Sequence, residues 1–172
     1  GIFHDRLSPD TSKITATGHV KIVRRLMEAV LNPHETEQAT SWSEREATDI
    51  VDMGKILYAC LVSRWPLGTP SAPASLAALP SGNTRHAQKT WGLAAAPADG
   101  HGWLTPRQVQ PGVSPALDVL CDQILSQQPR HDEVPVRSAS EIYQALARVL
   151  GSADAAADLE RRLRYPTAAA QR

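Results

Sequence analysis

The sequence predicts a mainly helical domain that is organised around one central buried helix and carries one small β-hairpin. The central segment runs from Trp42 to Pro66 and opens with Ser43 and Glu46, which have the spacing of a capping box. From Ile50 to Val62 the segment is apolar almost all the way round, which is typical of a helix packed on every side. Pro66 then ends it, so we expect a helix over residues 42–64.

The residues before this helix predict a hairpin. Residues 13–16 alternate weakly, Thr17-Gly18 has the composition of a two-residue turn, and residues 19–23 form the returning strand. Residues 26–31 then predict a short helix.

Three more helices are expected towards the C-terminus. The first spans 115–127 with Ser114 as its cap and Pro115 at its first position. The second begins at Ser138 or Ser140 and ends at Gly151, and the third spans 154–163. The expected inner faces are Leu117, Leu120, Cys121, Ile124 and Leu125 for the first helix, and Ile142, Tyr143, Leu146, Val149 and Leu150 for the second. Arg161, Arg162 and Arg164 are interpreted as a solvated helix end.

Between the central helix and these three lies a segment rich in Pro, Gly, Ala and Ser, at residues 67–112. Its composition predicts a loop-rich insert. Trp91 and Trp103 stand out from this composition, and we expect them to dock the insert onto the domain rather than to form a patch that binds a partner.

Composition excludes several classes of protein. The 172 residues carry a net charge of zero, so there is no signature of binding to nucleic acid. The two cysteines, Cys60 and Cys121, lie in apolar runs and are expected to be reduced and buried. There is no clustered Cys/His motif, so no metal site is expected, and no signal peptide or membrane-spanning run, which predicts a cytoplasmic protein. Because the chain opens at Gly1 without an initiator Met, we expect it to be a fragment that starts inside a domain.

The order of the motifs resembles the C-terminal lobe of a protein kinase over residues 2–150. Residues 4–11, His-Asp-Arg-Leu-Ser-Pro-Asp-Thr, correspond to the catalytic loop H-R-D-L-x-P-x-N, and 24–26 stand where D-F-G would follow the hairpin. Residues 49–66 are similar to the kinase F helix, 113–125 to its H helix, and 137–141 to the start of its I helix. The resemblance implies a kinase-like C-lobe at 1–150 whose N-lobe is absent from this chain. Residues 67–112 would replace the G-helix region, and 151–172 would form a terminal helix and linker. It also implies that Ile22, Val23 and Leu26 are poorly buried, because their kinase counterparts lie near the interface between the two lobes.

The departures from the family pattern imply a pseudokinase. Phosphoryl transfer uses an Asp as base and an Asn and an Asp as Mg²⁺ ligands, and the corresponding positions here hold Arg6, Thr11 and Arg24. Asp5 is offset by one residue and Asp10 falls outside the catalytic set, so neither replaces the missing carboxylates. No catalytic residue, no metal and no Mg-ATP are therefore expected.

Framework positions of the family do remain. By this resemblance, His4 is the histidine that packs under the catalytic loop, and Asp49 is the carboxylate that accepts backbone N–H groups of that loop. Arg137 corresponds to the arginine that pairs with a glutamate of the activation segment, and that glutamate is missing from the shortened segment here. We expect His4 and Asp49 to be purely structural. Thr36, Thr40 and Ser41 lie in the activation-segment region and are candidate phosphorylation sites, although ordinary loop residues are the more frequent case.

Within kinase-like proteins, the chain is most similar to actinobacterial pseudokinase domains fused to, or encoded beside, the MurJ/MviN lipid II flippase of peptidoglycan synthesis. Residues 105–121, Thr-Pro-Arg-Gln-Val through Leu-Asp-Val-Leu-Cys, carry this likeness together with 64–66 and 138–141. It implies a regulatory scaffold at the cytoplasmic face of the plasma membrane, attached through its parent protein without inserting itself. A receptor Ser/Thr kinase would phosphorylate it, with Thr167 as the candidate site, and a forkhead-associated protein would then bind. The alternatives are a Ser/Thr kinase with a divergent active site and a generic helical interaction domain.

Overall fold

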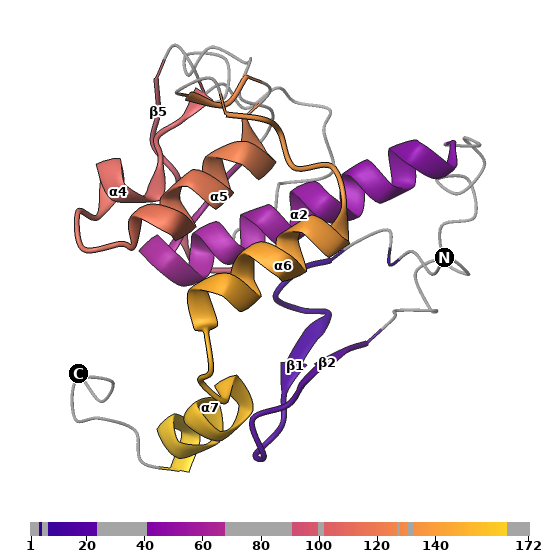
Figure 1. Ribbon diagram of the computed structural model, residues 1–172, viewed down its shortest axis with the longest axis vertical. Helices are drawn as coiled ribbons and strands as arrows, with labels where there is room; N and C mark the ends of the chain where they lie inside the picture. Colours follow the sequence, from indigo (N-terminus) through magenta and orange to yellow (C-terminus); the bar gives the residue numbers. More distant parts are fainter. Residues whose placement is uncertain are drawn as a thin grey trace.

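The computed structural model describes residues 4, 7–23, 41–67, 91–99, 102–126, 128–130 and 133–164 (Figure 1). This part of the chain is mainly helical, as the sequence predicts. Its helices are α2 (Trp42–Val62), α4 (Pro106–Val109), α5 (Pro115–Leu125), α6 (Ala139–Leu150) and α7 (Ala155–Arg164). Its strands form three separate pairs: β1 (Ser12–Ile14) with β2 (Val20–Ile22), β3 (Arg64–Trp65) with β4 (Ala94–Ala95), and β5 (Ala98–Asp99) with β6 (Gly102–Trp103).

Helix α2 begins at a different cap from the one expected. The Ser41 side chain accepts the N–H of Glu44, and the Glu44 carboxylate accepts the N–H of Ser41 at 2.7 Å. The expected box at Ser43 and Glu46 is therefore wrong by two residues. Both pairs of residues have the spacing of a capping box, so the sequence pattern alone does not distinguish them. The helix ends at Val62, two residues before the expected end, because Ser63 adopts a left-handed backbone with φ 54°.

Burial of α2 is one-sided. Its buried residues recur about once per turn, at Asp49, Ile50, Gly54, Tyr58 and Val62. Ile56 and Leu57 are half-buried, and Cys60 is exposed. The expectation of a helix buried on every side is thus wrong, because α5, α4 and β3 pack along one side of it within the described chain.

The core lies where α5 crosses α2. Gly54 permits the close approach of the two helices, since a Cβ at this position would lie 2.4 Å from Cγ2 of Ile124. Trp103 and Val113, which lie outside these two helices, and Ile142 of α6 belong to the same core. The full buried set is Ile50, Tyr58, Val62, Trp103, Val113, Leu120, Cys121, Ile124, Leu125 and Ile142.

Helix α6 begins at Ser138, one of the two caps that the sequence allows, and ends at Gly151 as predicted, but its inner face is narrower than expected. Ser138 and Glu141 form its capping box and Gly151 ends it. Ile142 is buried and Leu146 packs against the core, whereas Tyr143 is 73% exposed and Val149 and Leu150 are also exposed. The expected inner face was too wide because α6 meets the core along one edge only.

The β1–β2 hairpin is antiparallel, with Lys13 opposite Lys21 and Ile14 opposite Val20. Its turn holds three residues rather than two: Thr15 donates its N–H to His19 at 2.8 Å, and Gly18 takes the positive φ of 76°. Ile22 and Val23 are exposed, as expected. Leu26 and the short helix expected at 26–31 lie outside the described residues.

The described part of the expected insert, residues 91–99 and 102–112, holds only short elements, the two-residue strands β4, β5 and β6 and the four-residue helix α4, joined by irregular chain. Residues 68–90 lie outside the described chain. Trp103 is buried in the core, and Trp91 makes an edge-to-face contact with Trp65 at 4.4 Å between ring centroids. The prediction that both tryptophans dock this segment onto the domain is confirmed.

Candidate functional site

The segment that the sequence singled out, residues 4–11, is anchored to α2. The carboxylate of Asp49 accepts the backbone N–H of His4 through Oδ2 at 2.8 Å, across 45 positions of sequence. Asp49 is buried in the first half of α2, so its position is fixed by the helix and its environment by the core. A hydrogen bond from a backbone amide to a carboxylate in such a setting is charge-assisted and holds a loop in place.

Two polar atoms at this anchor, Oδ1 of Asp49 and Nδ1 of His4, are buried without a hydrogen-bond partner among the described residues. A buried polar atom without a partner costs free energy. Asp5 and Arg6, which follow His4 directly, lie outside the described residues.

Thr11 closes a turn rather than presenting its hydroxyl to a cleft. Its Oγ1 accepts the N–H of Ser8 at 2.9 Å and donates to the Ser8 carbonyl at 3.0 Å. The Thr11 carbonyl accepts the N–H of Val23 at 2.7 Å, which ties the turn to the base of the hairpin. Thr11 is itself buried, so its hydroxyl serves the turn.

A second carboxylate of α2, Asp52, lies one turn after the anchor. Burial raises the pKa of Asp52; the ion pair with Lys55, 3.4 Å away, and a hydrogen bond from the Leu7 backbone oppose that rise. The base of the loop therefore rests on two acidic residues from α2. Lys55 supplies the cation that faces Asp52.

Several of the predicted site residues cannot be placed. Arg24, Thr36, Thr40 and Thr167 lie outside the described residues, like Arg6. Arg137 is exposed, and its backbone N–H donates to the Glu141 carboxylate at 2.9 Å as part of the α6 cap. Among the residues that the structure describes, no group of three or more His, Cys, Asp or Glu side chains could hold a metal ion.

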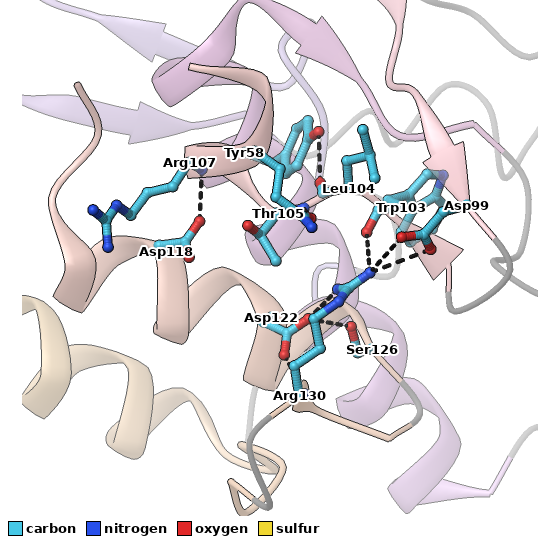
Figure 2. A network of polar contacts seen from close by, with 11 residues as sticks. Tyr58, Asp99, Trp103, Leu104, Thr105, Arg107, Asp118, Asp122, Ser126 and Arg130 are labelled. Atoms are coloured by element: carbon cyan, nitrogen blue, oxygen red, sulfur yellow. Dashed lines mark hydrogen bonds and ion pairs between the residues drawn. The ribbon is translucent and has the colours of Figure 1, made fainter. Parts of the chain in front are cut away.

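The strongest polar cluster is one that sequence reasoning missed (Figure 2). Asp122, inside the apolar face of α5, pairs with Nη1 of Arg130 at 2.7 Å and accepts the Arg130 backbone N–H at 2.6 Å. Nη2 of Arg130 reaches Asp99 at 3.3 Å and the Trp103 carbonyl at 3.3 Å. The signal available in the sequence was an Asp next to Cys121 on a buried helix face, since a buried carboxylate needs a partner.

This Arg130 cluster, comprising Asp99, Asp122 and Arg130, joins three parts of the fold. It connects α5, the segment after α5 and the β5–β6 pair. Nearby, Asp118 accepts the N–H of Arg107 at the start of α4 at 2.6 Å, and the Tyr58 hydroxyl donates to the Leu104 carbonyl at 3.0 Å. All these contacts hold the 94–109 segment against α2 and α5, so we interpret them as structural.

No family model, no curated protein and no solved structure matches the chain. Its function is therefore inferred from the residues and contacts described above. No helix within the described ranges is long and apolar enough to cross a membrane.

Proposed function

We propose that this chain is the C-terminal lobe of a pseudokinase that regulates peptidoglycan synthesis as a scaffold. The observation that carries the proposal is the hydrogen bond from the backbone of His4 to the buried Asp49 carboxylate. It ties a loop that resembles a kinase catalytic loop to the helix that resembles the kinase F helix. This contact supports the proposal, because the two segments are neighbours in the family pattern as well.

The chemistry of the loop favours a scaffold over an enzyme. Phosphoryl transfer needs a base and oxygen ligands for Mg²⁺, and the three positions concerned hold Arg6, Thr11 and Arg24. Guanidinium groups stay protonated and repel a divalent cation, by about 4 kcal/mol for unit charges 4 Å apart in a partly shielded site. The hydroxyl of Thr11 is also engaged by Ser8, so it does not replace an amide ligand.

The proposed mechanism is phosphorylation-dependent binding. A receptor Ser/Thr kinase modifies a threonine outside the helical core, with Thr167 favoured over Thr36 and Thr40. A forkhead-associated protein then binds the phosphothreonine. A phosphate adds about two negative charges and three acceptor oxygens, which is enough to create a site for a basic pocket on a partner.

The catalytic half of the proposal is tested by phosphate transfer. The full-length protein that contains this chain is incubated with radiolabelled ATP, Mg²⁺ or Mn²⁺, and a generic acceptor protein. We expect no transfer, because loss of the general base alone lowers the rate by about 10²–10⁴-fold. Transfer that Arg6→Ala or Arg24→Ala abolishes, while the exposed-surface control Arg148→Ala leaves it intact, would establish the alternative, a divergent Ser/Thr kinase.

The scaffold half is tested separately. The protein is treated with a receptor kinase and captured on an immobilised forkhead-associated domain. We expect capture to need phosphorylation and to be lost in Thr167→Ala, but to persist in Thr17→Ala, whose threonine lies in the exposed hairpin turn. Equal capture of the untreated protein would contradict the scaffold mechanism and leave the catalytic test unaffected.

A further inference from the structure

Helix α7 lies against the turn of the β1–β2 hairpin, and the contact is made by main-chain atoms (Figure 1). Gly18 is buried in this contact although the strands on both sides of it are exposed. A Cβ on Gly18 would stand 2.2 Å from the carbonyl oxygen of Ala156 and 2.9 Å from the backbone nitrogen of Glu160. Only glycine allows the two backbones to approach this closely.

Helix α7 also has polar interactions of its own that do not involve the hairpin. Asp154 caps its start by accepting the N–H of Ala157 at 3.0 Å. Its ion pairs are internal: Asp158 with Arg162 at 2.7 Å and with Arg161 at 3.5 Å, and Glu160 with Arg164. Acidic residues near the start and basic residues at the end also suit the helix dipole. Leaving the hairpin would break none of these interactions.

The connection to the rest of the fold permits such a movement. No residue of α7 is buried, so no core side chain has to leave its place. The helix follows α6 after a short turn at Gly151, where φ is 62° and a Cβ would meet no atom within 4 Å. Neighbouring atoms therefore leave space around this turn.

We infer that α7 is a releasable strap that closes on the hairpin turn and holds the hairpin in place. A hairpin of two strands is marginally stable by itself, and Ile14, Val20 and Ile22 are exposed along this one. The hairpin is joined at its base to the Ser8–Thr11 turn through Val23 and Thr11. Docking of α7 therefore orders the hairpin and, through it, the loop anchored at Asp49. The strap is independent of whether the chain is a pseudokinase.

Hydrogen exchange with a matched pair of variants tests the strap. Gly18→Asn keeps the left-handed backbone accessible, because Asn tolerates it, but places a side chain where Ala156 lies. Gly92→Asn is the control, since Gly92 has a similar φ of 80° and no atom within 4 Å of its Cβ position. In Gly18→Asn we expect amides of residues 155–164 and of the hairpin to exchange at least about tenfold faster, with α5 and α6 unchanged, as for local opening. Exchange equal to that of Gly92→Asn would overturn the inference.

A distance measurement covers the case in which Gly18→Asn fails to fold. Thr17 and Ala157, both exposed, are changed to Cys and spin-labelled in a Cys60→Ser background, with Gly18 intact. We expect a short distance in buffer and a second, longer population that grows in urea below the global unfolding transition. A single distance up to global unfolding would show that α7 is a fixed part of the fold.

Discussion

At the scale of single residues, the Asp122 carboxylate is a buried polar group with several partners. Its side chain is 7% exposed, and it accepts hydrogen bonds from the Ser126 hydroxyl, the Arg130 backbone and the Arg130 guanidinium. Removing one partner of a buried pair costs more than the pair contributes, because the other charge stays buried. Arg130 keeps Asp99 as a second partner, which limits that loss.

We therefore expect Asp122→Ala to lower the free energy of unfolding by about 3 kcal/mol, the low end of the range for breaking a buried ion pair. Urea unfolding measures it as a lower transition midpoint. Asp158→Asn is the control. It removes a carboxylate that also pairs with an arginine, Arg162, at 2.7 Å, but on the surface of α7, so it should leave the midpoint unchanged. A stability of Asp122→Ala equal to that of the control would mean that the Arg130 cluster contributes nothing.

The two cysteines differ in reactivity for a physical reason. Cys121 is 1% exposed, and burial raises the pKa of its thiol to about 12. Cys60 lies on the exposed side of α2, and partial burial raises its thiol pKa as well. Because the thiolate is the reactive form, Cys121 is protected from thiol-reactive reagents in two ways: reagents do not reach it, and its thiol stays protonated.

A thiol-reactive dye at pH 8 should thus modify one cysteine of the native protein, Cys60, more slowly than a free thiol. The second should react only when urea unfolds the chain. Absorbance of the released dye counts the thiols, and Cys60→Ser should abolish the native reaction. Two thiols reacting rapidly in the native protein would show that the α2–α5 interface is open.

At the scale of elements, the close crossing of α2 and α5 sets the packing of the core. Gly54 is the residue that permits it, since a Cβ there would lie 2.4 Å from Ile124 and 3.0 Å from Leu125. Two effects of a methyl group oppose each other at this position. Alanine favours a helix over glycine by about 1 kcal/mol, whereas overpacking a core costs about 1–3 kcal/mol.

We expect the overpacking to exceed the gain, so Gly54→Ala should destabilise the protein by about 1 kcal/mol. Thermal or urea unfolding checks this. Gly112→Ala is matched to it, because a Cβ at Gly112 meets nothing within 4 Å, and it should change the stability little. A more stable Gly54→Ala protein would imply that α5 can shift away from α2 without loss.

Local signals predicted the elements well. The Pro115 start of α5 and the Gly151 end of α6 each follow from a few adjacent residues, and one of the two candidate caps of α6, Ser138, is the one used. Where two signals of the same spacing overlap, as with Ser41–Glu44 and Ser43–Glu46, the local pattern does not distinguish them. The hairpin was placed correctly, but its turn was counted one residue short, since Ala16 belongs to the turn rather than to a strand.

At the scale of the whole molecule, the errors about the burial of α2 and α6 have one cause. The apolar composition of a helix shows which side chains could be buried, but it does not show how many other elements pack against the helix. For this reason the sequence predicts that α2 is covered on every side and that α6 buries Tyr143. The pairing of Asp122 with Arg130 joins residues eight positions apart across a bend in the chain, which no periodicity reveals. The contact of His4 with Asp49 spans 45 positions and was expected only through the resemblance to a family.

The contact between Trp65 and Trp91 gives the protein an optical signature of its own. Two indole rings whose centroids lie 4.4 Å apart at an angle of 68° couple their electronic transitions, and the coupling decays steeply as the rings separate. Trp65 directly follows α2, and Trp91 opens the segment that returns to the core through Trp103. Circular dichroism in the indole bands therefore follows the attachment of this segment to the helical core, without any label.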